Sequence, residues 1–208
     1  MGRATALWFG SEHTFTTNQM VQAGFFNNKQ TAGRHIKKWC DDKKIHAIGS
    51  VRLGEGRETR VYGKHKVSAL KHDVCMTQAI INMGIFDMNC SRNWYGAEND
   101  QHQLIGKEML PDALWSYQKS MFAFEYDGGT ENKNQLNARI EKIDFVMQKF
   151  GIKNFSIVWI TRSKKRLVTI QSCCERIKDN VFFTTLNNCG ELWQDYDSKE
   201  IPVTKPCY

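Results

Sequence analysis

The sequence predicts an α/β (α+β) fold in two parts, a small module over residues 1–66 and a larger body over residues 67–208. Three observations lead to this division. The first part contains a helical apolar pattern followed by a Gly-rich hairpin signal, and the second alternates strand-like and helix-like patterns. Charge divides at the same place, because residues 1–66 hold 12 Lys/Arg and 5 Asp/Glu, whereas residues 67–208 hold 17 of each. The whole net charge of +7 therefore lies in the first part.

Composition limits the class of protein. A chain of 208 residues with an apolar fraction of 41% can form a packed core in one or two domains. We find no apolar run of eighteen residues and no signal-peptide pattern, which predicts a soluble, cytoplasmic protein without a membrane partner. The seven cysteines are odd in number and form no C-x-x-C pair, so we expect free thiols and no structural zinc.

The first part fits a winged helix-turn-helix. A short helix over residues 17–23 ends at Gly24, Asn27-Asn28 supply a turn, and a second helix covers residues 30–42. Residues 48–53 and 57–62 then read as two strands joined by Gly54-Glu55-Gly56. A winged helix normally begins with a longer first helix than residues 4–10 provide. We therefore expect the module to be either trimmed at its N-terminus or completed by another chain.

Two sets of polar residues in this module are candidates for contact with double-stranded DNA. Side chains of the second helix would face base edges or phosphates in a major groove, and hairpin arginines would contact phosphate or the minor groove. The helix set is Gln30, Thr31, Arg34, Lys37 and Lys38, and the hairpin set is Arg52, Arg57 and Arg60. The simpler alternative is a solvated amphipathic helix. Helix, hairpin and segregated charge together favour DNA binding.

The body begins with a predicted helix and continues with alternating elements. In order, they are a helix over residues 66–82, strands over residues 93–97, 113–117 and 121–124, a helix over residues 131–150 with Thr130 as N-cap, a strand over residues 155–160, a helix over residues 163–178 and a strand over residues 181–185.

Carboxylates stand out in the middle of the body. Asp112 and Glu125 flank two strands joined by a short turn, so antiparallel pairing would bring them to the same end of the sheet. Alternation places Glu125 and Asp127 on one face of their strand, with Phe124 and Tyr126 on the other. Oxygen ligands suit magnesium or manganese, which serve phosphodiester chemistry. The alternative is a Pro-Asp turn followed by solvent-facing acids on an edge strand.

This order of elements and acids resembles the PD-(D/E)xK nuclease-like fold, with elements αβββαβαβ. The resemblance implies that Asp73, Asp112 and Glu125 hold Mg or Mn. Five segments narrow the resemblance further: Arg60-Val61-Tyr62-Gly63, Lys71-His72-Asp73, Leu110-Pro111-Asp112-Ala113, residues 124–131 and Phe182-Phe183-Thr184-Thr185-Leu186. Through these segments the chain resembles the replication-relaxation family of plasmid and mobile-element proteins, which join an N-terminal winged helix to such a body.

The chain departs from the nuclease pattern at the position of its lysine, which here is Asp127. That lysine helps to position the attacking water and to offset charge in the transition state. A replacement cation would come from the next helix, where Gln135, Arg139 and Lys142 share one face. The catalytic candidates are therefore Asp112, Glu125, Asp127, Arg139 and Lys142.

Three functions stay open at this point. The first is a DNA-binding protein of a plasmid, phage or integrated element that acts in replication or mobilisation through a nuclease-like domain, whose site is either intact or degenerate. The second is an active Mg/Mn-dependent DNA endonuclease or nickase, and the third is a sequence-specific transcription regulator. The expected partners are double-stranded DNA, a second copy of the chain in a homodimer, and replication or mobilisation proteins.

Overall fold

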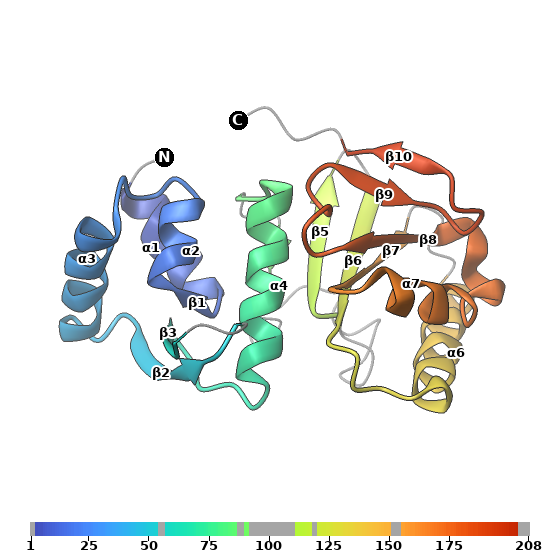
Figure 1. Cartoon of the computed structure of the whole chain (residues 1–208), viewed down its shortest axis with the longest axis horizontal. Coiled ribbons are helices and arrows are strands. Elements are labelled where there is room, and N and C mark those ends of the chain that lie inside the picture. Colours follow the sequence, from blue (N-terminus) through green and yellow to red (C-terminus); the bar gives the residue numbers. More distant parts are fainter. Residues whose placement is uncertain are drawn as a thin grey trace. The chain divides into compact units, whose positions relative to one another are not determined.

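A computed structural model describes residues 3–53, 57–86, 90–91, 111–117, 120–150 and 155–203. The chain forms two compact units, Met1–Phe86 and Asp87–Tyr208, each built around a β-sheet (Figure 1). The predicted mixture of helices and strands is thus confirmed. The hairpin tip at residues 54–56 and the strand predicted over residues 93–97 lie outside the described residues. Within the described ranges, no helix is both long and apolar enough to cross a membrane.

The first unit combines four helices with a small antiparallel sheet among its described residues. The strand order is β1-β3-β2, so β1 and β2 both pair with β3. Its elements are α1 (Arg3–Glu12), β1 (Phe15–Thr16), α2 (Thr17–Gln22), α3 (Lys29–Asp41), β2 (His46–Val51), β3 (Thr59–Gly63) and α4 (Leu70–Met83). The helix α1 is longer than the stretch over residues 4–10 considered in the sequence, and it contributes the fully buried Phe9.

Local signals explain the boundaries of α2 and α3. Thr16 and Gln19 form a capping box at the start of α2, in which each side chain bonds the other residue's backbone N–H. Gly24 follows with φ of +73°, a left-handed conformation that a residue with a Cβ rarely adopts. Asn28 then caps α3 by accepting a hydrogen bond of 2.8 Å from the Thr31 backbone N–H.

The boundary between the units lies twenty residues later than the predicted division at residue 66, because α4 packs in the first unit. Val74 of α4 forms a buried cluster with Val51 and Val61 of the hairpin. Gln19 donates a buried hydrogen bond of 2.8 Å to the Val74 carbonyl, and Thr77 donates one of 2.7 Å to the Thr14 carbonyl. These contacts satisfy buried polar groups that would otherwise destabilise the unit.

The second unit is built on a mixed sheet with strand order β10-β9-β8-β7-β6-β5-β4 in its described part. The central strands β6, β7 and β8 are parallel, and the outer pairs are antiparallel. The elements are β4 (Cys90–Ser91), β5 (Ala113–Tyr117), β6 (Ser120–Asp127), α6 (Lys133–Phe150), β7 (Phe155–Thr161), α7 (Lys164–Gln171), the 3-10 helix η2 (Glu175–Asn180), β8 (Val181–Thr185), β9 (Leu192–Gln194) and β10 (Glu200–Pro202).

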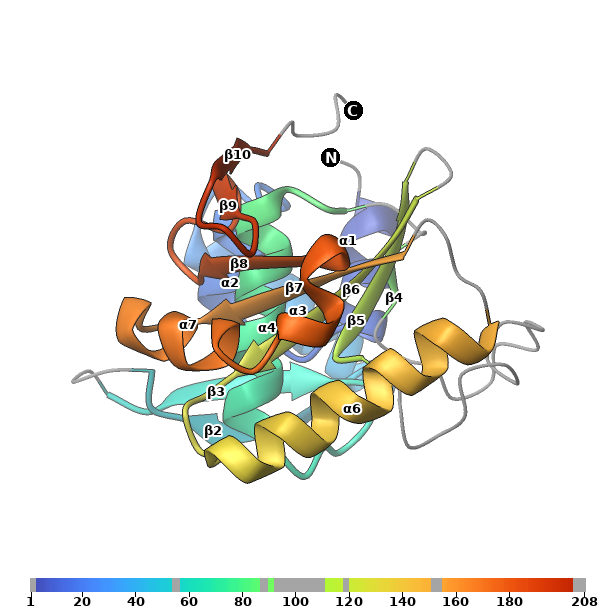
Figure 2. The same cartoon turned by 90° about the vertical axis from the view of Figure 1, so that its right-hand side faces the viewer.

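One face of this sheet is covered by α6, α7 and η2 (Figure 2). The core on that face joins alternate strand residues such as Ala123, Ile157 and Phe183 to helix residues such as Leu136 and Ile170. Burying this apolar surface drives the packing of the helices on the sheet. In β6 the same alternation turns Glu125 and Asp127 toward the helical face.

Several predicted elements of the body need correction. The helix predicted over residues 66–82 begins at Leu70, and the one predicted over residues 163–178 ends at Gln171, after which η2 starts. Asn132, not Thr130, caps α6, because Asn132 and Gln135 exchange side-chain hydrogen bonds with each other's backbone N–H. The strands β9 and β10, which extend the sheet beyond β8, had no counterpart in the sequence prediction.

Candidate functional site

The first candidate surface is the polar face of α3. The opposite face is buried through Ala32, Ile36 and Trp39, which anchors the helix in the first unit. This anchoring leaves the predicted set turned outward: Gln30, Arg34, Lys37 and Lys38 are exposed, and Thr31 is half-buried. The charge on this face is therefore available to a polyanion.

The β2–β3 hairpin carries the second predicted set. Arg52, Arg57 and Arg60 are all exposed. Val51 and Val61 hold the two strands in place by packing against Val74 of α4. Arg52 directly follows Val51 in the sequence, and Arg60 directly precedes Val61. The hairpin thus adds three positive charges to the same unit as α3.

The second candidate site lies where β5 begins and β6 ends. Ala113 pairs with Phe124, so the preceding residue, Asp112, comes to the end of the sheet at which Glu125 lies. The Tyr126 backbone N–H donates a hydrogen bond of 2.7 Å to Asp112 Oδ2. Glu125 and Asp127 are buried, with 5% and 3% of their surface exposed. Buried carboxylates of this kind require compensating charge or hydrogen bonds.

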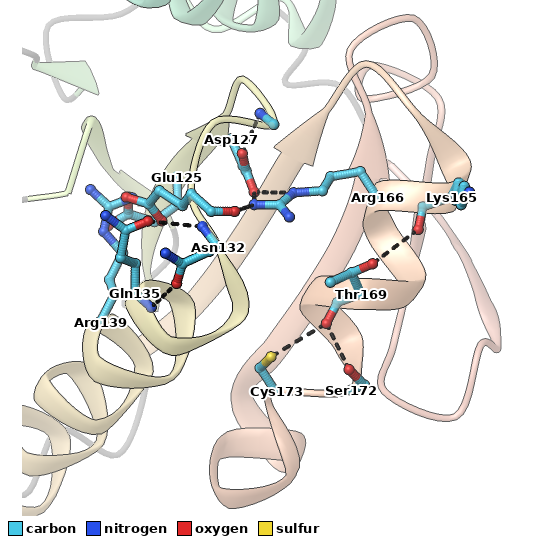
Figure 3. A network of polar contacts seen from close by, with 12 residues as sticks. Glu125, Asp127, Asn132, Gln135, Arg139, Lys165, Arg166, Thr169, Ser172 and Cys173 are labelled. Atoms are coloured by element: carbon cyan, nitrogen blue, oxygen red, sulfur yellow. Dashed lines mark hydrogen bonds and ion pairs between the residues drawn. The ribbon is translucent and has the colours of Figure 1, made fainter.

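Arg166 of α7 supplies that compensation for Asp127. Its Nη2 lies 2.6 Å from Asp127 Oδ2, and its Nε donates a hydrogen bond of 2.7 Å to the same oxygen. Nη2 also donates to the Glu131 carbonyl at 2.6 Å. The other carboxylate oxygen of Asp127 accepts the Gly129 backbone N–H at 2.5 Å. Figure 3 shows Arg166 extending from α7 to Asp127.

Arg139 of α6 occupies the space beside Glu125. Its Nη1 lies 3.5 Å from Glu125 Oε2 and 3.4 Å from Glu131 Oε1 (Figure 3). Burial lowers the pKa of Arg139, but the negative charges of Glu125, Glu131, Asp112 and Asp127 outweigh that effect and raise the pKa overall. Four carboxylates therefore act on one guanidinium group, which stays protonated.

Of the two cations predicted to replace the missing lysine, Arg139 contacts the carboxylates and Lys142 does not. Lys142 is exposed and forms no ion pair within the part of the chain that the structure describes. Gln135, on the same predicted face, is engaged in capping α6. Arg139 lies in the second turn of α6, and Lys142 lies nearly one turn further along the helix.

The predicted magnesium or manganese site stays a prediction. Of its three predicted ligands, Asp73 lies in the first unit, where its Oδ1 is 3.5 Å from His72 Nδ1, and Asp112 and Glu125 lie in the second unit. Glu125 and Asp127 face arginines, and Asp112 accepts a backbone N–H. Among the described side chains, no group of three or more His, Cys, Asp or Glu is arranged to hold a metal ion.

Arg166 is the site residue that sequence reasoning missed. It lies 39 residues after Asp127, in a helix to which the pattern assigned no role. A signal was present, because β6 and β7 each end in a polar residue and α7 follows β7 directly. If β6 and β7 are parallel neighbours, the first turn of α7 lies beside the end of β6, and a basic residue there can reach Asp127.

A model of the replication-relaxation family matches residues 45–154, slightly more than half of the chain. The match begins before β2 and ends after α6, so it includes Asp112, Glu125, Asp127 and Arg139. It excludes α3 and Arg166. No curated protein and no solved structure matches the chain.

Proposed function

Because the chain belongs to the replication-relaxation family, we propose that it acts in the replication or mobilisation of a plasmid, phage or integrated element by binding double-stranded DNA. The exposed basic face of α3 carries this proposal. That face lies on the unit that holds the whole net charge of +7, beside a hairpin with three exposed arginines. The order helix, strand, two helices and hairpin supports the interpretation as a winged helix.

The proposal is tested by Arg34→Ala combined with Lys38→Ala, with DNA affinity measured by fluorescence anisotropy at two salt concentrations. We expect binding to weaken by about tenfold or more, because contacts to bases or phosphates contribute about 1–3 kcal/mol each. Lys43→Ala combined with Lys44→Ala is the control, since it removes the same charge from the exposed turn after α3. Equal effects in the two double variants would remove α3 from the proposal.

For the second unit, we infer a nuclease-like domain that binds DNA and does not hydrolyse it. The ion pairs of Asp127 with Arg166 and of Glu125 with Arg139 support this inference. Asp127 stands where a nuclease of this fold has its lysine, and the nearest arginine side chain is held by Asp127 itself. Arg139 is likewise shared between Glu125 and Glu131, which leaves less of its charge for a transition state.

A nicking assay separates this inference from the active alternative. Purified wild-type protein should leave supercoiled DNA intact with Mg²⁺ or Mn²⁺. Nicking that requires the metal and disappears in Glu125→Ala would establish the endonuclease instead. Homodimer formation stays a prediction, which sedimentation of the purified protein checks.

A further inference from the structure

The second unit has no net charge, but it contains a basic segment. Residues 87–208 hold 16 Lys/Arg and 16 Asp/Glu, but residues 145–174 hold six Lys/Arg and no acid. The segment that follows, residues 175–208, holds four Lys/Arg and six Asp/Glu. Charge is therefore divided inside this unit as well as between the two units.

Four of these six basic residues surround the start of α7. Arg162, Lys164 and Lys165 are exposed, and Arg166 is half-buried because it pairs with Asp127. Arg166 thereby holds the first turn of α7 against the end of β6 through Asp127 Oδ2 and the Glu131 carbonyl. Figure 3 shows Lys165 on the side of α7 away from Asp127.

The placement of these lysines opposes a local preference of helices. The first turn of a helix carries partial positive charge and favours acidic side chains, yet α7 has Lys164, Lys165 and Arg166 there and no acid. Asp127, the nearest acid in the contacts of this turn, is buried and paired with Arg166, so it does not offset the two lysines at the surface. Sequences tend to break local rules where function requires it.

We propose that Arg162, Lys164 and Lys165 form a second DNA-binding surface, which contacts the phosphate backbone. This proposal rests on the proposed function, because it assumes that the DNA bound by the first unit also contacts the basic residues of the second. Charge complementarity favours a phosphate backbone, since the exposed groups are long cations that donate charge-assisted hydrogen bonds to phosphate oxygens. Simultaneous contact by two linked units raises affinity through effective concentration.

The test is Lys164→Ala combined with Lys165→Ala in the full chain. The affinity for a labelled duplex is measured as a function of salt. Two lost phosphate contacts should weaken binding and reduce the slope of log K against log salt by about 2. The matched control is Arg176→Ala combined with Lys178→Ala, which removes the same charge from exposed residues that pair with Glu141 and Glu175. The control should leave the slope nearly unchanged.

A second pair of variants excludes a folding defect. Lys164→Glu combined with Lys165→Glu places acids where the helix dipole favours them, so the fold should be retained while DNA binding weakens further. The control for this variant is Arg176→Glu combined with Lys178→Glu, which reverses the same number of charges. Equal slopes in the wild type and both Lys164/Lys165 variants would overturn the proposal.

The outcome for α3 distinguishes this proposal from the proposed function. If Arg34→Ala combined with Lys38→Ala weakens binding and the Lys164/Lys165 variants do not, the second surface fails and the proposed function stands. If only the Lys164/Lys165 variants weaken binding, the second surface stands and α3 loses its role. A wild type that does not bind duplex at low salt would overturn both.

Discussion

Asp127 is the residue on which the interpretation of the second unit depends. It stands at the position of the lysine in the predicted nuclease pattern, and its buried carboxylate contacts Arg166 and the Gly129 backbone N–H. A buried ion pair contributes little net stability, but removing one partner leaves an uncompensated charge. We therefore expect the loss of Arg166 to leave the Asp127 carboxylate without its ion pair.

The first prediction concerns this pair. Arg166→Met should lower the free energy of unfolding by roughly 3–5 kcal/mol, as expected when a buried pair loses one partner. Adding Asp127→Asn should restore part of that loss, because a neutral amide needs no counter-charge. Urea denaturation of the two single variants and the double variant gives the coupling energy.

Arg176→Met serves as the control for this cycle. Arg176 pairs with Glu141 on the surface, and surface pairs contribute about 0–1 kcal/mol. A loss in Arg166→Met no greater than in Arg176→Met would show that the Asp127 charge is compensated elsewhere.

Arg139 leads to the second prediction. Its guanidinium offsets the charge of Glu125 and Glu131, so Arg139→Gln leaves carboxylates without that cation. We expect Mn²⁺ to raise the melting temperature of this variant by about 5 °C or more, through binding to the folded state, and to leave the wild type unchanged. Differential scanning fluorimetry measures the shift.

Lys142→Gln is the matched control, because Lys142 lies on the same helix but is exposed. It should behave as the wild type does. A wild type already stabilised by millimolar Mn²⁺ would instead mean that metal and arginine occupy the site together.

At the scale of elements, the parallel pairing of β6 and β7 determines the site. It aligns Asp127 with Thr161 at the strand ends, and α7 starts three residues after Thr161. The antiparallel pairing of β5 and β6 brings Asp112 to the same end. One antiparallel and one parallel strand pairing thus bring Asp112, Asp127 and Arg166 to the same end of the sheet, although they come from three separate segments of the chain.

The third prediction concerns the start of α6, which positions Arg139. Asn132→Ala should cost about 0.5–2 kcal/mol, because it removes a side-chain cap. Thr130→Ala, which the sequence pattern alone would mark as the cap, should change stability by no more than about 0.5 kcal/mol. Chemical denaturation of both variants decides between the two caps, and a larger loss for Thr130→Ala would contradict the structure.

At the scale of the whole molecule, the division into units follows the packing of α4. Its apolar residues complete the core under the β2–β3 hairpin, and its backbone accepts the Gln19 side-chain hydrogen bond. The fourth prediction follows from this. A fragment of residues 1–86 should unfold cooperatively, whereas a fragment of residues 1–66 should lack a cooperative transition, because Gln19 and the hairpin valines lose their partners.

Circular dichroism melts of the two fragments test this difference. A fragment of residues 87–208 is the companion control, since it should retain its own transition. If residues 1–66 melt as cooperatively as residues 1–86, α4 is dispensable to the first unit.

The sequence by itself determined features that depend on local periodicity and on one turn. The buried and exposed faces of α3, the bounds of β5 and β8, and the shared sheet end of Asp112 and Glu125 all agree with the structure. Each follows from side chains a few residues apart or from a single hairpin, where chain geometry leaves little choice. The family was likewise indicated by short motifs in order along the chain.

Only the tertiary structure decided which distant elements meet. An amphipathic pattern shows that α4 has an apolar face but not which core that face joins, and this face packs in the first unit against the β2–β3 hairpin. Nor does periodicity state that β6 and β7 are parallel neighbours, the arrangement that brings Arg166 to Asp127 across 39 residues. The charge state of the site depends on that pairing, because a buried carboxylate takes whichever cation the packing of the chain places beside it.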